Sequence, residues 1–584
     1  MFFSTSQIEI SVIFTPKKSI FNIKYTVETL DCIVIGAFSL ALIGIILWVL
    51  RQKQDTSSDY FLSGRDATWI AIGASIFASN IGSEHLIGLA GAGASSGMAM
   101  AHWEIQGWMI LLLGWVFVPF YSRSMVYTMP EFLERRYNPQ SRTILSFISL
   151  ISYVLTKVAV TVYAGGLVFQ QVFGIEEIWG IDFFWIAAIG LVVLTAIYTI
   201  IGGMKSVLYT SVLQTPILLL GSLIILVLGL KELGGWDELI RIAGATKVNE
   251  FGDSMTSLIR SNSDPNFPWL GALIGSAVIG FWYWCTDQYI VQRVLSGKNQ
   301  KESRRGSIFG AYLKLLPVFL FMIPGMIAFA LHQKTGSFLP LLDGNPNADA
   351  AFPTLVAKLL PAGMKGMVVC GILAALMSSL ASLFNSSSML FTIDFYKRFK
   401  PDTSEKKLVV IGQIATVVIV VLGILWIPIM RSVGDVLYKY LQDVQSVLAP
   451  GIAAAFLLGV CWKRTSAKGG MWGLIAGMVI GLTRLGAKIF YSTAAAPGEN
   501  IFKYVFYDIN WLFFSGWMLL FCLIVVILVS LFTEAPSKEK IQGLVFGTAT
   551  KEQLTETRYS WNRWDIIHTC IILGITVAFY IYFW

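Results

Sequence analysis

The sequence is dominated by apolar runs of about 20 residues that are separated by short polar segments. Such a run is as long as an α-helix must be to cross the hydrocarbon core of a bilayer, which is about 30 Å thick. Of the 584 residues, 55% are hydrophobic and 13% are charged, whereas soluble domains carry about 25% charged residues. The chain is therefore predicted to be an all-α polytopic membrane protein with the lipid bilayer around it.

About fourteen membrane spans are expected if each needs about 20 apolar residues. They lie near 30–50, 68–93, 105–125, 143–173, 180–201, 208–230, 268–294, 306–331, 364–395, 407–429, 436–461, 468–487, 511–532 and 565–584. Residues 1–28 are predicted to be an N-terminal tail, and residues 29–584 to form a single transmembrane domain.

Lys and Arg residues are concentrated in alternate loops. The loop after the first span carries Arg51, Lys53 and Arg65, and the loops after the seventh and ninth spans are also strongly basic. The positive-inside rule places these loops in the cytoplasm. Because the number of spans is even, both termini are predicted on the outer side. This bias also accounts for the formal net charge of +8, so no nucleic-acid partner is predicted.

Motifs of soluble enzymes are absent from the sequence. It has no Walker A loop, no GxSxG and no HExxH. None of the six cysteines forms a CxxC pair, and the four histidines lack metal-ligand spacing. We therefore predict no enzymatic activity, no direct drive by ATP, no disulfide framework and no zinc site.

The run at 68–93 is interrupted at its centre by small and polar residues, namely Ser79, Asn80, Gly82, Ser83, Glu84 and His85. This interruption predicts a break in the helix. Unwound backbone at membrane depth is tolerated only inside protein or beside a water-filled cavity. The run at 268–294 is similar, because two glycines precede a cluster of aromatic and polar residues. Two broken segments in corresponding positions indicate the site of an inverted-repeat transporter.

Three polar side chains of the first break are predicted to face one cavity, because residues four apart share a helix face. Asn80, Glu84 and His85 offer donors and acceptors but no permanent cation, which suits a neutral polyhydroxylated ligand. The alternative is contact between packed helices, where polar side chains contribute about 0.6 kcal/mol each.

Two ionisable residues stand near membrane depth elsewhere. Glu104, at the start of the third span, could accept hydrogen bonds from sugar hydroxyls beneath a lid formed by Trp103, or could be solvated. Lys314 lies inside the eighth span. Such residues usually face a cavity or a partner, but a long side chain can also reach the cytoplasmic surface.

Aromatic and small polar residues complete the candidates. The triplet Trp282–Trp284 lies at the second predicted break, where aromatic faces can pack on the apolar face of a sugar, although aromatic belts also occur at membrane interfaces. Gln442 is a hydrogen bonder if it faces inward. Ser378 and Ser379 offer hydroxyl oxygens to a monovalent cation, although small residues also permit close helix packing.

Several long segments together resemble the solute:sodium symporter family, and most of all its sodium/glucose cotransporter branch. These segments are DYFLSGR at 59–65, ASNIGSEHLIGLAG at 78–91, WYWCTDQYIVQRVLSGKN at 282–299, AYLKLLPVF at 311–319, SSLASLFNSSSMLFTIDFY at 378–396 and AAFLLGVCWKR at 454–464. The resemblance extends from residue 30 to the end of the chain.

The resemblance implies a LeuT-type fold, with two inverted five-helix repeats whose first and sixth core helices are discontinuous. The core repeats would cover residues 66–230 and 268–461. The peripheral helices would be 30–50, 468–487, 511–532 and 565–584.

The resemblance also implies positions for the ligands. Sodium would be held by the backbone carbonyls of Ala78, Ile81 and Ala375 and by the hydroxyls of Ser378 and Ser379. The sugar would be bound by Asn80, His85, Glu104, Tyr283, Trp284, Lys314 and Gln442. Tyr283 would be the inner gate, and the outer gate would consist of Leu89, Trp103 and Tyr438. Glu84 receives no role.

The sequence departs from the family pattern at one place. Ser211 stands where many members have an aspartate that is linked to a second sodium site, and Ala381 lacks a hydroxyl that this site would need. The resemblance therefore implies one sodium ion per sugar.

The expected function is sodium-driven symport of a neutral monosaccharide, similar to glucose or galactose, by alternating access across the plasma (inner) membrane. One alternative is symport of another solute, such as an inositol, sialic acid or an amino acid. A second alternative is a sodium-linked sensor or channel, although the sequence carries no appended signalling domain. The sequence leaves the oligomeric state open.

Overall fold

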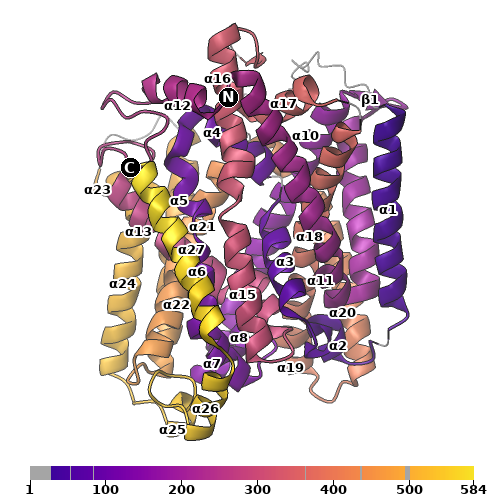
Figure 1. The fold of residues 1–584 in the computed structure, drawn as a ribbon. Helices are drawn as coiled ribbons and strands as arrows, with labels where there is room; N and C mark the ends of the chain where they lie inside the picture. Colours follow the sequence, from indigo (N-terminus) through magenta and orange to yellow (C-terminus); the bar gives the residue numbers. More distant parts are fainter. Residues whose placement is uncertain are drawn as a thin grey trace, which may run out of the picture.

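The computed structural model describes residues 28–584, apart from residues 53, 83, 343, 362, 434–436 and 494–499. The predicted tail, except its last residue, lies outside this part of the chain. The described residues form a bundle of long upright helices with short helices and loops at both ends (Figure 1). The prediction of an all-α membrane protein is confirmed, since eleven of the described segments are long and apolar enough to cross a membrane.

The first half of the chain forms the elements from α1 to α12. They are α1 (Thr29–Leu50), α2 (Ser57–Leu62), η1 (Ser63–Arg65), α3 (Trp69–Asn80), η2 (Glu84–Leu89), α4 (Ala90–Ser96), η3 (Gly97–Met100), α5 (Ala101–Glu104), α6 (Gly107–Leu112), η4 (Leu113–Phe117), α7 (Val118–Ser124), α8 (Met129–Arg136), α9 (Pro139–Ser152), η5 (Tyr153–Val158), α10 (Ala159–Phe173), β1 (Glu177–Ile178), β2 (Ile181–Asp182), α11 (Phe183–Leu233) and α12 (Trp236–Ala245). Strands β1 and β2 form a small antiparallel hairpin.

The second half begins with another broken helix and ends with peripheral helices. Its elements are α13 (Trp269–Gly280), η6 (Phe281–Thr286), α14 (Gln288–Leu295), α15 (Gln300–Lys314), η7 (Val318–Met322), α16 (Ile323–Thr335), β3 (Leu341–Leu342), β4 (Asn345–Pro346), η8 (Ala348–Ala350), α17 (Ala351–Leu359), α18 (Met364–Met389), η9 (Leu390–Tyr396), α19 (Lys397–Phe399), α20 (Glu405–Val433), α21 (Leu437–Cys461), α22 (Ala467–Thr493), α23 (Ile501–Lys503), η10 (Tyr504–Asp508), α24 (Trp511–Leu531), α25 (Lys538–Ile541), α26 (Lys551–Tyr559) and α27 (Arg563–Tyr582). Strands β3 and β4 also pair antiparallel.

There are eleven long segments and fourteen predicted spans. The numbers differ because some long segments contain two predicted spans, and because a span that is broken into shorter helices is not counted as a long segment. The 51-residue α11 contains most of 180–201 and all of 208–230, and its two parts meet at Gly203, where φ is +50°. A Cβ atom there would lie 2.4 Å from the carbonyl oxygen of Tyr60, so only glycine fits. The predicted span 143–173 is divided into α9, η5 and α10.

Both predicted breaks are present. Helix α3 ends at Asn80, and Ile81 has an extended backbone with ψ 116° before the chain resumes as the π-helical η2. In the second half, η6 ends at Thr286, and Asp287 is extended with ψ 128° before α14 begins. The Asp287 side chain accepts a hydrogen bond from the amide of Tyr289 and so caps α14. Both breaks leave backbone groups without a partner in their own helix.

The second half of the first broken helix, α4, is fixed by close packing against η7 and α16. A Cβ atom on Gly93 would lie 2.3 Å from the carbonyl oxygen of Met322, and one on Gly325 would lie 1.9 Å from that of Ala90. Helices α4 and α16 therefore touch through their backbones. Small residues permit this approach in membrane proteins, where van der Waals packing drives helix association.

Gly325→Ala is therefore expected to destabilise the protein, because α16 must move away from α4 to make room for the methyl group. Overpacking of a close contact costs about 1–3 kcal/mol, and sometimes more. A lower midpoint of thermal unfolding in detergent, followed by tryptophan fluorescence, would show this. Gly190→Ala in α11 is the control, because its Cβ meets nothing within 4 Å. Equal stability of the two variants would contradict the packing argument.

Figure 1 shows that α1 begins and α27 ends at the same end of the bundle. This arrangement agrees with the even number of spans in the sequence analysis. The short helices α25 and α26 lie at the opposite end (Figure 1), where α25 contacts α8. Which end faces the cytoplasm remains a prediction from the loop charges.

Candidate functional site

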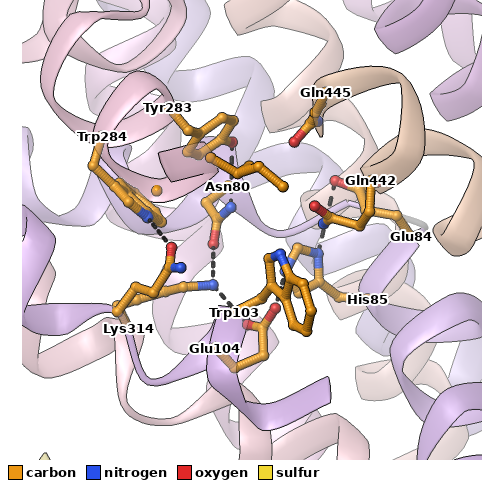
Figure 2. A pocket seen from close by; sticks show the side chains of 13 residues that line it. Asn80, Glu84, His85, Trp103, Glu104, Tyr283, Trp284, Lys314, Gln442 and Gln445 are labelled. Atoms are coloured by element: carbon orange, nitrogen blue, oxygen red, sulfur yellow. Dashed lines mark hydrogen bonds and ion pairs between the residues drawn. The ribbon is translucent and has the colours of Figure 1, made fainter. Parts of the chain in front are cut away.

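A cavity of about 50 Å³ lies between the two broken helices, α5 and the start of α21 (Figure 2). It is lined by Asn80, Glu84, His85, Trp103, Glu104, Gln106, Ile279, Gly280, Tyr283, Trp284, Lys314, Gln442 and Gln445. All seven residues that the sequence predicts for the solute site are in this set, although they come from distant parts of the chain. The structure thus brings them together around one hollow.

Lys314 and Glu104 form a buried ion pair at the cavity. Lys314 Nζ lies 2.6 Å from Glu104 Oε2, and the exposed fractions of the two residues are 3% and 1%. Lys314 therefore does not reach the membrane surface, and Glu104 is not solvated. The alternatives given in the sequence analysis, a Lys314 side chain that reaches the cytoplasmic surface and a solvated Glu104, are therefore wrong.

Asn80 connects this ion pair to the second broken helix. Lys314 Nζ donates to Asn80 Oδ1 at 3.0 Å, and Asn80 Nδ2 donates to the Tyr283 hydroxyl at 3.2 Å. The amide at the end of α3 therefore joins α15 to η6 (Figure 2). A change in either broken helix must disturb this chain of contacts.

The first residues after the break add two more polar groups. His85 Nε2 lies 3.5 Å from Glu104 Oε1, and His85 Nδ1 lies 3.7 Å from Glu84 Oε1. The amide of Gly82 points at His85 Nδ1 across 3.5 Å. Glu84 received no role from the family resemblance, but it lines the cavity together with its neighbour, as the spacing of the polar residues predicted.

Aromatic residues form the remaining walls. The rings of Tyr283 and Trp284 meet edge to face with centroids 4.9 Å apart, and the Trp284 indole donates to Gln106 Oε1 at 3.1 Å. Gln106 also donates to the carbonyl of Ser276 at 2.8 Å. Trp103 stacks on Trp511 at 5.5 Å between ring centroids. Two residues of the aromatic triplet, Tyr283 and Trp284, therefore line the cavity, whereas Trp282 is buried but does not belong to its wall.

Sequence analysis missed two glutamines of the cavity wall. Gln106 follows Glu104 by two residues, and Gln445 follows Gln442 by three, which puts both glutamines of α21 on one helix face. The second spacing was visible in the sequence and could have identified Gln445. Gln106 carried no comparable signal.

Three buried polar atoms around the cavity have no hydrogen-bond partner within the described part of the chain, namely Glu84 Oε2, Trp103 Nε1 and Gln442 Oε1. Buried polar groups are usually hydrogen-bonded to protein or to water. Two acceptors and one donor are therefore available to a hydroxylated ligand. The cavity itself is far smaller than the roughly 300–1,000 Å³ of ordinary ligand pockets, so it must widen before a sugar ring fits.

The predicted gate residues have different positions. Tyr283 and Trp103 line the cavity. Leu89 is fully buried in η2 but is not part of the cavity wall. The side chain of Tyr438 lies outside the described residues.

The predicted sodium ligands lie where α3 breaks and where α18 passes it. Ala78, Ile81, Ala375, Ser378 and Ser379 are all buried. The two helices are joined next to these residues, because the hydroxyls of Ser79 and Ser382 lie 2.7 Å apart. The last four carbonyls of a helix have no intrahelical partner, which leaves the end of α3 with free acceptors.

The chemistry of this donor set suits sodium. Transporters of this architecture coordinate sodium through the carbonyl oxygens of unwound backbone. Hydroxyl oxygens are also uncharged and can act as further ligands of the ion. Ser379 Oγ donates to Ala375 O at 2.9 Å, but a hydroxyl that donates still has lone pairs for a cation. Among the described residues, no group of three or more His, Cys, Asp and Glu residues could hold a metal ion.

Ser211 lies beside this donor set. Its hydroxyl is 3.3 Å from that of Ser378 and 3.4 Å from that of Ser75, and it donates to the carbonyl of Val207 at 2.6 Å. Three hydroxyls from α3, α11 and α18 therefore meet at a position that carries no carboxylate.

A second buried ion pair lies behind Tyr283. Lys157 Nζ is 2.7 Å from Asp287 Oδ2 and 4.8 Å from the centre of the Tyr283 ring. Asp287 also accepts a hydrogen bond from the Tyr153 hydroxyl. The sequence analysis did not identify Lys157, although a lysine in an apolar run is itself a signal of a buried partner.

Comparisons with known proteins agree with this architecture. The sequence model of the Sodium:solute symporter family matches residues 60–477. Sodium/myo-inositol cotransporter 2 of Mus musculus is 39% identical over 543 residues, which are 90% of this chain and 80% of the relative. Sodium/glucose cotransporter 4 of Danio rerio is 35% identical over 570 residues, which are 94% of this chain and 86% of the relative.

A solved structure of a Na+-coupled sialic acid symporter, in a substrate-bound outward-open state, superposes with a TM-score of 0.71. It shares 22% sequence identity, and the match covers 87% of this chain and 99% of that one. At this identity the likeness shows the fold alone, and it confirms the LeuT-type fold that the sequence predicts.

The family match and the two relatives cover most of the chain and its cavity. They show a sodium-coupled solute transporter and not an enzyme. The chain belongs to the sodium:solute symporter family.

Proposed function

We propose that this protein carries out sodium-driven symport of a neutral monosaccharide similar to glucose or galactose. Transport proceeds by alternating access across the plasma membrane, with both termini on the outer side. The observation that carries the proposal is the Lys314–Glu104 ion pair, which neutralises the one lysine of the cavity wall. The cavity then offers hydrogen bonds and aromatic surface, but no spare lysine or arginine.

The charge of the cavity argues against anionic and zwitterionic solutes. Sialic acid and amino acids carry a carboxylate, which is usually held by a cation. Here Glu84 adds a second carboxylate next to His85, and its Oε2 atom is buried without a hydrogen-bond partner in the described part of the chain. A neutral solute avoids repulsion from Glu84 and can donate hydroxyl groups to it.

The aromatic walls suit the ring of a sugar. Trp103, Tyr283 and Trp284 line the cavity beside Asn80 and Gln442. Aromatic faces pack against apolar C–H groups, while the amides and carboxylates bond the hydroxyl rim. This combination favours a polyhydroxylated ring over a linear polar solute.

myo-Inositol is the second candidate, because one of the similar relatives is named a sodium/myo-inositol cotransporter. It is also a neutral ring of hydroxyl groups, so the cavity chemistry accommodates both. The deciding experiment measures sodium-driven uptake of labelled galactose, glucose and myo-inositol into proteoliposomes, with sialic acid as an anionic competitor. We expect competition among the neutral rings and none from sialic acid. Strong inhibition by sialic acid would contradict the charge argument.

One broken turn provides the coupling between the two ligands. In this proposal the carbonyls of Ala78 and Ile81 hold sodium, while Asn80 and His85 line the solute cavity. Sodium that orders this turn favours the state that binds solute, and the solute favours sodium to the same degree. A charge crossing 100 mV supplies about 2.3 kcal/mol. A tenfold sodium gradient adds about 1.4 kcal/mol, which together can concentrate solute several hundred-fold.

One sodium ion is expected per solute, because Ser211 brings a hydroxyl to the place where a second site would need a carboxylate. The measurement is the ratio of charge to labelled solute carried into voltage-clamped cells, with uncoupled leak subtracted in the absence of solute. A ratio near one charge per solute is predicted. A ratio near two, with a Hill coefficient near two for sodium, would contradict it.

A further inference from the structure

A second hollow lies on the outside of the bundle, remote from the solute cavity in sequence. Its volume is about 400 Å³, and it is lined by Leu150, Phe391, Phe395, Tyr396, Phe399 and Lys400. Leu150 belongs to α9, and the other five belong to η9, α19 and the residue that follows. This groove therefore lies between α9 and the end of the α18 segment, at the end of the bundle that carries the basic loops.

Most of the groove wall is apolar, and part of it is exposed on the outside of the bundle. The side chain of Phe399 is 81% exposed, and that of Phe391 is 42% exposed. Phe147 and Ile151 of α9 are also exposed and extend the apolar surface along that helix. In a helix that crosses a bilayer, such a surface meets acyl chains and not water.

The mouth of the groove is basic. Residues 397–407 contain five basic and two acidic side chains. Glu405 is already held by Ser57 and Lys397. Arg398 donates only to neutral groups among the described residues, namely the Pro139 carbonyl and the Thr143 hydroxyl. Lys400 forms part of the groove wall itself. The charge at the mouth is therefore positive and available to an anion.

At the floor of the groove, α9 is in contact with η9, the segment that continues α18. Three residues of the groove belong to η9, a π-helical segment, and such segments are frequent at functional sites. In the same turn, Asp394 accepts a bond from Arg142 of α9 at 2.7 Å. This turn continues α18, which carries the proposed sodium ligands Ser378 and Ser379.

We propose that the groove binds an anionic glycerophospholipid of the cytoplasmic leaflet. One acyl chain lies against Phe391, Phe395 and Phe399, and the phosphate lies near Arg398 and Lys400. The assignment to this leaflet rests on the orientation given by the loop charges, and anionic lipids are concentrated there. The bound lipid fills the hollow between α9 and η9. It thereby stabilises the end of α18, the helix that carries the proposed sodium ligands.

The test uses the full chain in vesicles of equal parts phosphatidylcholine and phosphatidylglycerol that contain a trace of photoactivatable phosphatidylglycerol. Labelled peptides are identified by mass spectrometry. We expect labelling of the segments around Leu150 and Phe395, and weaker labelling with photoactivatable phosphatidylcholine. Each basic residue near the surface contributes about 1 kcal/mol to the binding of anionic lipid, so the double variant Arg398→Ala/Lys400→Ala should lose at least about tenfold in this preference.

Two further variants separate the groove from general charge effects. Lys551→Ala is the control, because it removes one exposed lysine from α26 at the same end of the bundle, and it should label as the unmodified protein does. Leu150→Trp keeps the charges but fills the groove, and should lower labelling with both lipids. Equal labelling by the two lipids, an unchanged preference in the double variant, or cross-linking of the groove to a second copy of the chain would overturn the proposal.

Discussion

Lys314→Met is expected to lower sodium-driven solute uptake by at least about a hundredfold. The substitution leaves the Glu104 carboxylate buried without its partner at 2.6 Å, and breaking a buried pair in this way costs about 3–5 kcal/mol. It also removes the donor that holds Asn80 Oδ1 at 3.0 Å. Uptake by proteoliposomes at saturating sodium measures the effect, with reconstituted protein quantified in each preparation.

Two variants show whether this loss concerns the site or the fold. Lys298→Met removes a lysine whose exposed ion pair with Asp66 spans 3.9 Å, and it should leave uptake almost unchanged, since such pairs contribute about 0–1 kcal/mol. The double variant Lys314→Met/Glu104→Gln removes both charges. It should regain thermal stability, because neither charge of the pair is then left buried without its partner, but it should not regain uptake. Near-normal uptake by Lys314→Met would contradict the proposed role of this pair.

Ser378→Ala is expected to weaken activation by sodium by at least about tenfold. A hydrogen bond or ligand contact to a charged group contributes about 1.5–3 kcal/mol, and the side chain is buried 3.3 Å from the hydroxyl of Ser211. The measurement is the sodium concentration that gives half-maximal uptake, and Ser379→Ala should behave in the same way. The apparent affinity for solute at low sodium should fall as well, because coupling is reciprocal.

Ser388→Ala is the matched control for this prediction. Ser388 lies on the same helix and is fully buried, but its hydroxyl bonds only to the carbonyl of Asn385 in its own helix, at 3.0 Å, as far as the described residues show. We expect its activation by sodium to be unchanged. A normal sodium dependence in both Ser378→Ala and Ser379→Ala would mean that sodium binds elsewhere.

The breaks could be predicted from sequence because their cause is local. Small and polar residues in the middle of an apolar run, as at Ser79 and Gly82, weaken a membrane helix wherever the run packs. The structure ends α3 at Asn80, within this stretch. The second break follows the same logic, since Asp287 caps the helix after it.

The direction of long side chains could not be predicted, because it depends on partners far away in the sequence. Lys314 could have extended to the surface, and only the position of Glu104, 210 residues away, keeps it inside. The same holds for Gln106, which faces the cavity because Trp284 and Ser276 lie beside it. The π-helical segments also had no sequence signal, since they change the helix period only over five to seven residues.

The count of spans illustrates the same limit. Gly203 was one of many glycines in an apolar stretch, and nothing in the sequence distinguished it as the point where two spans join within α11. Its constraint comes from Tyr60, which packs against it from another helix. Local composition thus predicted which segments cross the membrane, whereas the joints between them depend on tertiary packing.

The most direct test of the account measures labelled solute inside proteoliposomes with an inward sodium gradient and a negative interior potential set by potassium and valinomycin. The account predicts accumulation of galactose, glucose or myo-inositol well above the outside concentration. This accumulation increases with the potential, and it collapses when outside sodium is replaced by choline while the potassium gradient, and with it the potential, is kept. Uptake that is indifferent to sodium and to the potential, or a sodium current without accumulation of solute, would contradict it.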